Sequence, residues 1–375
     1  MQEPAVSEQG AVEARGVPAS PVSLGLFDIM QVDPGRENEI ADLFARRLDA
    51  LAYADTLGYT VAFSAERHFM PSYACASATA WVAAATQRTT RMRLGMLGYT
   101  LPIHHPIDLA EEIAMLDLLS RGRLEAGFGL GHRIEELVAL GVDPGERITL
   151  FQERLAIMQA LWSGGTIAFE RGNVIAREVA IAPLPEQTPH PPLWFAGTDP
   201  AGAHWMGQRG LGLAVGFKPT QALIPAVAAF MAGRIARDPE SIAAEPVRPA
   251  GTIALMRPVY LSDSDERAMD EIADDLLLLD EKLGRASGEG SRADRRADAR
   301  TRAEGMLRDE VMFAGGVESV AAAILAARRA LRFDLLLANV HAAGVSDERV
   351  ERTMRLLAEE VRPLLVEADL AARAE

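Results

Sequence analysis

Eight short apolar segments alternate with segments of helical pattern along most of the chain, and this alternation limits the possible folds more than any other feature of the sequence. We interpret the apolar segments as buried strands; they are residues 22–27, 60–64, 92–100, 123–128, 193–196, 211–215, 251–261 and 333–340. The segments between them place apolar residues at helical spacing, as Ile40, Leu43 and Leu51 show. Strands that alternate with helices form parallel sheets with right-handed crossovers. The pattern therefore predicts an α/β fold with a single closed (β/α)8 barrel, the TIM barrel, carrying insertions.

The domain organisation follows from where this alternation begins and ends. Residues 22–366 are predicted to form one barrel domain, residues 1–21 a disordered N-terminal tail, and residues 367–375 a C-terminal tail. Residues 166–182 are expected to form a small β excursion. Residues 285–305 contain almost no large apolar side chain and are therefore predicted to be an insertion, either a mobile lid over a pocket or a plain linker.

Composition narrows the classes of protein to which the chain can belong. Its formal net charge of −15 at pH 7 argues against nucleic acid or an anionic membrane surface as the main partner. The longest apolar runs are interrupted before they reach the length that spans a membrane. Residues 1–16 carry early acidic residues and no apolar core, unlike a secretory signal. We therefore expect a cytoplasmic protein.

The second predicted strand ends in a group of titratable residues, within the sequence TVAFSAERHFM. Glu66 and His68 lie two positions apart, so in an extended segment their side chains point to the same side. Active sites of (β/α)8 barrels are built at the C-terminal ends of the strands. The pair is therefore a candidate acid/base site, although a single histidine after an apolar run is more often structural.

No metal site is expected. Cys75 is the only cysteine, which leaves no intrachain disulfide and no thiolate zinc site. The histidines are at positions 68, 104, 105, 132, 190, 204 and 341, a spacing not typical of metal ligands. His104 and His105 are adjacent on the loop after the third strand, and we interpret them as residues that line a pocket or anchor the loop.

Two further strand ends carry features that suit a flat ring or a phosphate. The fourth strand runs into GFGLGH, residues 127–132, where glycine allows close approach of a ligand to the backbone. Thr198 and Asp199 follow the fifth strand and precede Pro200, which begins a helix. A helix N-terminus favours a bound anion. The alternative is that Thr198 or Asp199 only caps the helix.

These motifs in this order resemble the luciferase-like, flavin-dependent monooxygenase superfamily. The matching segments are GLF at 25–27, AERHF at 65–69, LGYTLPIHHP at 97–106, LDLLSRGRLEAGFGLG at 116–131, PHPPLWFAGTDP at 189–200 and MFAGGVESV at 312–320. The segment from 100 to 131 is the most specific. His68 matches the second of two histidines that follow the glutamate in luciferases, whereas Arg67 stands at the first. The chain is identified as a non-luminous member.

The resemblance implies a flavin at the C-terminal mouth of the barrel and an oxidoreductase that oxygenates a small organic substrate with O2. Reduced FMN, loosely bound, would come from a separate flavin reductase, and the protein would be a homodimer. The resemblance assigns catalysis to His68 with Glu66. It assigns cofactor binding to Phe27, Tyr99, Thr100, Gly129, Gly131, Gly197, Thr198 and Asp199.

Two alternatives remain open. An F420-dependent oxidoreductase of the same fold would transfer hydride, and a non-catalytic flavin-binding barrel would do no chemistry. The second is suggested by Leu130, which replaces a phosphate-binding arginine of luciferases, and by the charge of Asp199. Arg67 or Lys218 could supply the missing cation.

Overall fold

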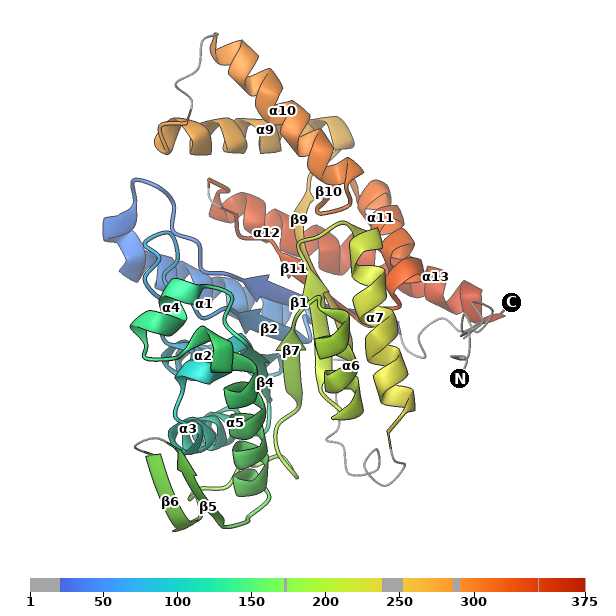
Figure 1. Cartoon of the computed structure of the whole chain (residues 1–375). Coiled ribbons are helices and arrows are strands. Elements are labelled where there is room, and N and C mark those ends of the chain that lie inside the picture. The colour runs from blue at the N-terminus through green and yellow to red at the C-terminus, as the bar shows by residue number, and fades with distance from the viewer. Residues whose placement is uncertain (1–20, 172–173, 238–251, 286–290, 343, 375) are drawn as a thin grey trace, which may run out of the picture.

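The structure, a computed structural model, describes residues 21–171, 174–237, 252–285, 291–342 and 344–374. A closed barrel of parallel strands forms its centre (Figure 1). The barrel strands are β1 (Ser23–Asp28), β2 (Val61–Ser64), β3 (Arg93–Thr100), β4 (Leu124–Gly129), β7 (Leu193–Ala196), β8 (Gly212–Gly216), β9 (Ile253–Leu261) and β11 (Leu335–Asn339). Each pairs with the next, and β1 also pairs with β11, which closes the ring. The predicted (β/α)8 barrel is confirmed.

Helices cover the outside of the barrel. They are α1 (Ile40–Thr56), α2 (Ala78–Thr86), α3 (Pro106–Ser120), α4 (Ile134–Ala139), α5 (Arg147–Trp162), α6 (Pro200–Gln208), α7 (Thr220–Ile235), α9 (Asp265–Lys282), α10 (Arg292–Arg308), α11 (Val317–Leu331), α12 (Asp347–Leu356) and α13 (Arg362–Ala374). Proline begins both α3 and α6, where its missing N–H leaves no helical bond unmade. Among the described residues, no helix is long and apolar enough to cross a membrane.

Large side chains fill the barrel interior, so ligand space is left only at its ends. Phe63, Leu97 and Trp194 belong to this inner cluster, and the rings of Phe63 and Trp194 meet edge to face at 5.8 Å. Strands β3 and β4 approach closely at Gly95, where an added Cβ would lie 2.0 Å from the carbonyl oxygen of Glu125. Only glycine fits there, because a larger residue would separate the two strands.

The insertions lie at opposite ends of the molecule (Figure 1). Strands β5 (Ile167–Arg171) and β6 (Val174–Val179) form an antiparallel hairpin after α5, which confirms the expected β excursion. Helices α9 and α10 lie over the end to which β9 points, and the short strand β10 (Phe313–Gly315) extends the sheet beside β9. Neither α4 nor β10 is predicted from the sequence.

The structure differs from the sequence expectation in two segments. Residues 292–305 belong to α10, and Ser291 caps the start of this helix in a capping box with Asp294. Residues 367–374 do not form a tail, because α13 continues through them and buries Asp369. The predicted N-terminal tail lies almost wholly outside the described residues, which begin at position 21.

Candidate active site

Glu66 lies at the centre of a hydrogen-bonded cluster just beyond the C-terminal end of β2. Only 2% of its surface is exposed. Its carboxylate accepts a hydrogen bond from the amide of Thr100 at 2.8 Å and lies 3.0 Å from Nε2 of His104. Nε2 of His68 is 3.6 Å away. The predicted proximity of Glu66 and His68 is thus observed, and His104 anchors its loop to Glu66 from 38 positions further along the chain.

The cluster shifts the pKa values of Glu66 and His68. Burial raises the pKa of Glu66, but the hydrogen bond from His104 and the nearby imidazole of His68 outweigh it and lower the pKa to about 2. The neighbouring Glu66 carboxylate raises the pKa of His68 above its ordinary value, against a smaller opposing effect of burial. Glu66 is therefore a carboxylate at neutral pH, and His68 retains its proton to higher pH than a free histidine does.

The backbone around His68 is fixed by cationic side chains. Arg133 donates from Nη1 to the carbonyl oxygen of His68 at 3.0 Å. Arg67 donates from Nη1 to the carbonyl oxygen of Glu66 at 2.8 Å. The guanidinium of Arg67 therefore supports the strand end on which both candidate catalytic residues stand.

A second polar group lies after β7 and β8. Nζ of Lys218 donates to the hydroxyl of Thr198 at 2.8 Å, beside the N-terminus of α6. Asp199 caps this helix, because its carboxylate accepts from the amide of Gly202 at 2.7 Å. The capping interpretation of Asp199 is therefore observed. Lys218 places a cation beside this helix N-terminus, while Leu130 packs against the hydrophobic core.

The glycines assigned to cofactor binding differ in the space beside them. An added Cβ at Gly129 would meet no atom within 4 Å, so the end of β4 is open there. At Gly131, where φ is +73°, a Cβ would lie 2.9 Å from both Leu137 and Thr100. At Gly197 it would lie 2.4 Å from the ring of Phe195. Only Gly129 leaves room for a ring or phosphate against the backbone.

The other residues assigned to cofactor binding lie either in the barrel interior or in the layer between strands and helices. Phe27 belongs to the inner cluster at the end of β1, and its ring is 5.9 Å from that of Phe217. Tyr99 instead packs in the cluster between strands and helices, 6.1 Å from the ring of Phe128. The amide of Thr100 is bound to Glu66. Phe27 therefore lies near the mouth, whereas the phenol of Tyr99 belongs to the outer packing.

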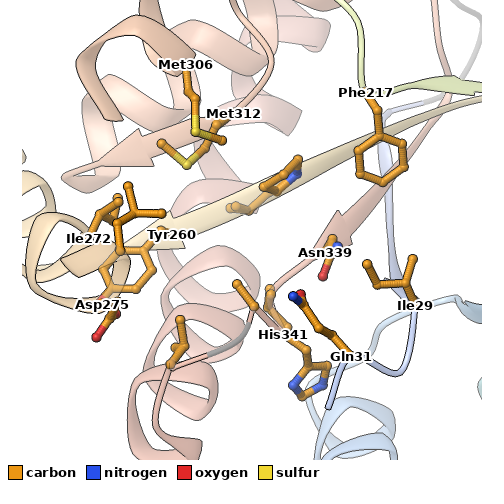
Figure 2. A pocket seen from close by; sticks show the side chains of 16 residues that line it. Ile29, Gln31, Phe217, Tyr260, Ile272, Asp275, Met306, Met312, Asn339 and His341 are labelled. Atoms are coloured by element: carbon orange, nitrogen blue, oxygen red, sulfur yellow. The ribbon is translucent and has the colours of Figure 1, made fainter. Parts of the chain in front are cut away.

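A cavity of about 260 Å³ opens at the same end of the barrel (Figure 2). Residues that follow β1, β8 and β11 line it, together with β9, α9 and α10. Phe217 lines this cavity, and the next residue, Lys218, holds Thr198. The cavity and the Thr198–Lys218 pair are thus linked by one short loop.

Sequence reasoning missed two polar residues of this cavity, Asn339 and His341. Asn339 is the next-to-last residue of the FDLLLANV segment, and His341 directly follows that segment. Both therefore lie at the C-terminal end of a barrel strand, as Glu66 and His68 do. That signal was available from the sequence. In the part of the chain that the structure describes, no group of three His, Cys, Asp or Glu side chains could hold a metal ion.

With this geometry established, sequence comparison defines the class of the protein. The family model described as luciferase-like monooxygenase matches residues 22–334. The chain belongs to this family.

One curated relative is the oxygenase component of a flavin-dependent trigonelline monooxygenase from Acinetobacter baylyi, 29% identical over 46% of this chain and 48% of its own length. The match spans less than two thirds of the length of the curated relatives.

Solved structures share the whole fold. The oxygenating constituent of 3,6-diketocamphane monooxygenase from Pseudomonas putida, in complex with FMN, has a TM-score of 0.74 at 19% identity and covers 92% of this chain and 98% of that one. The F420-dependent tetrahydromethanopterin reductase of Methanopyrus kandleri has a TM-score of 0.65 at 17% identity, with 92% and 99% covered. A flavin or a deazaflavin cofactor is compatible with this fold.

Proposed function

We propose that the protein is a monooxygenase that uses reduced FMN and O2 to oxygenate a small organic substrate. The observation that carries the proposal is the His68 imidazole, held beside the buried carboxylate of Glu66 at the mouth of a luciferase-like barrel. A proton donor with a raised pKa at such a mouth suits general acid/base chemistry. The trigonelline relative is called an oxygenase component, which supports a separate reductase as the partner.

The residues at the mouth fit a flavin mononucleotide. The Thr198 hydroxyl, Lys218 and the N-terminus of α6 form a cationic group suited to a phosphate. The open backbone at Gly129 provides a surface for a flat ring. Phe27 and Phe217 offer apolar faces nearby. We infer that these residues hold the cofactor, with Asp199 acting through the helix that it caps.

FMN, when bound and reduced, would supply the electrons with which O2 is activated. The protein's own part is to hold a proton and exclude water. His68 keeps a proton near Nε2 because Glu66 stabilises the imidazolium, and it can deliver that proton to a group bound in the mouth. His104 and the Thr100 amide hold Glu66 in place. Helix α10 contributes Met306 to the cavity wall and so helps to shield it from water.

The proposal is tested with the full-length protein, FMN, an NADH-dependent flavin reductase and 18O2. We expect substrate-dependent NADH consumption and a product that carries one 18O atom. His68→Ala should lower turnover by roughly a hundredfold or more, the scale for loss of a positioned acid/base group. His204→Ala is the control, because His204 contacts Ala229 between α6 and α7, away from Glu66.

Other outcomes would refute the proposal in distinct ways. Hydride transfer from reduced F420, with no response to FMN, would identify the F420-dependent alternative. Binding of FMN without turnover on any substrate would identify a non-catalytic barrel.

We further propose that the protein is a homodimer. Light scattering of the purified protein measures its molar mass and so tests this proposal directly.

A further inference from the structure

The cavity beneath α9 and α10 has a polar side and an apolar side (Figure 2). Met306, Met312 and Ile272 supply apolar surface on one side. Gln31, Asn339 and His341 gather on the other. At about 260 Å³ the cavity is at the small end of ligand sites, which are mostly apolar with a few placed polar groups.

Two of these polar groups are buried without a partner. Asn339 is 8% exposed and His341 is 4% exposed. Within the described residues, neither Oδ1 of Asn339 nor Nδ1 of His341 has a hydrogen-bond partner. Buried polar atoms are nearly always hydrogen-bonded, so two unsatisfied atoms on residues that line one cavity indicate a ligand that satisfies them.

The other polar groups of the cavity are already occupied. The hydroxyl of Tyr260 donates to Glu271 at 3.0 Å, and Asp275 forms an ion pair with Arg349 at 2.8 Å. The described lining residues include no lysine or arginine. A carboxylate or phosphate ligand would therefore enter without a free cation and beside Asp275, which disfavours an anion.

From this arrangement we propose that the cavity binds an uncharged, largely apolar molecule through a hydroxyl group, and that Asn339 and His341 select it. A hydroxyl can donate its proton to Oδ1 of Asn339 and accept a hydrogen bond from Nδ1–H of a neutral imidazole. A ketone has no proton to give to Asn339. The inference rests on the proposed function only in identifying this molecule as the substrate; the binding site itself needs no catalysis.

The conformation of the loop after β8 supports the placement of this site. Phe217 forms part of the cavity wall, and its neighbour Lys218 lies at the site inferred for the cofactor phosphate. The buried guanidinium of Arg257 donates to the carbonyl oxygen of Lys218 at 2.8 Å and holds the loop. A molecule in the cavity would therefore lie next to the inferred cofactor site.

The test compares ligands with one carbon frame and different polar groups. Full-length protein, free of flavin, is titrated calorimetrically with 2-decalol, 2-decalone and decalin-2-carboxylate. We expect the alcohol to bind about tenfold more tightly than the ketone, since the ketone leaves Asn339 unsatisfied. The carboxylate should bind at least tenfold more weakly than the alcohol.

Variants then assign the effect to the two residues. Asn339→Leu and His341→Leu should each reduce the preference for the alcohol to about twofold or less. Asn38→Leu makes the same substitution at an exposed site and should preserve the preference. Circular dichroism confirms that each variant is folded. If a variant does not fold, the alcohol and ketone affinities of the wild-type protein decide whether the inference holds.

Three results would overturn the inference: no binding of any of the ligands, equal affinity for alcohol and ketone, or an unchanged preference in both folded variants. Because flavin and O2 are absent, these results are separate from the proposed oxygenation. A protein that oxygenates other compounds but fails these titrations would contradict the inference alone.

Discussion

Two imidazoles and one backbone amide converge on the single carboxylate of Glu66. This arrangement determines which group carries charge near neutral pH. The carboxylate, with its pKa lowered to about 2, remains negative, and its charge stabilises protonated His68. The stabilisation is fully present below the unfolded-state pKa of His68 and is lost as pH rises through its raised folded-state pKa.

Removing the charge of Glu66 should therefore release the proton of His68 at lower pH. We expect Glu66→Gln to lower the pKa of His68, measured by NMR titration of its ring protons and assigned by comparison with His68→Ala. Asp108→Asn is the control, because Asp108 lies near His105 rather than His68. An unchanged pKa in Glu66→Gln would show that another group holds the proton.

Lys218 allows a direct test of the inferred phosphate site. Lys218→Met should weaken binding of FMN by roughly tenfold or more and leave riboflavin binding unchanged, since only FMN carries the phosphate. The salt dependence of FMN affinity should also decrease. Isothermal titration measures both. Lys282→Met is the matched control, because Lys282 lies exposed at the end of α9. Equal losses for both ligands would place the phosphate elsewhere.

Among the elements, α10 is held to α9 by ion pairs as well as by apolar contacts. Arg296 and Arg300 form ion pairs with Asp270 at 3.1 and 2.7 Å, and Arg296 also contacts Asp274 at 2.5 Å. The buried residues of α10 are the small Ala299 and Ala303. Exposed ion pairs are individually weak and are screened by salt. Such a helix can open more easily than the barrel beneath it, which is the property that a lid requires.

We therefore predict that Arg296→Glu opens α10 while the barrel stays folded, because the new carboxylate faces Asp270 and Asp274. Amide hydrogen exchange should rise in residues 292–308 only. If α10 acts as a lid, release of H2O2 per NADH consumed should also rise, since water reaches the site. Arg308→Glu is the control; the described residues show no ion pair for Arg308. Faster hydrogen exchange without a change in H2O2 release would show that α10 packs on the barrel but does not act as a lid.

At the scale of the whole molecule, α13 links α11 to the start of β1. Asp369 of α13 pairs with Arg328 of α11, and both side chains are buried. The same carboxylate accepts from the amide of Val22 at 3.2 Å, at the start of β1. These contacts join the last helix to the first strand, where β1 and β11 complete the ring.

Asp369→Ala should destabilise the protein by about 3–5 kcal/mol, because it removes the carboxylate that faces the buried Arg328 guanidinium. Urea unfolding followed by circular dichroism measures the change. Glu367→Ala, two residues earlier and exposed, should change the free energy of unfolding by less than about 0.5 kcal/mol. A change below about 0.5 kcal/mol in both variants would mean that α13 is a dispensable tail.

The sequence by itself determined the barrel, because hydrophobic periodicity is local and repeats in every unit. It also determined that Glu66 and His68 lie at the end of a strand and that their side chains point to the same side of the chain. It did not predict α10, whose charged residues and alanines lack the apolar stripe of a packed helix; α9 supplies the complementary carboxylates.

Only the tertiary structure decided which distant residues meet. His104 reaches Glu66 and Lys218 reaches Thr198 through strand order, which no local pattern encodes. The direction of Tyr99 was decided in the same way. Strand β3 shifts register against β4 between Met96 and Tyr99, and this irregularity interrupts the alternation of faces. In a regular strand, side chains two residues apart point to the same face. Because the strand is irregular here, Leu97 faces the barrel interior while Tyr99 packs in the layer between strands and helices.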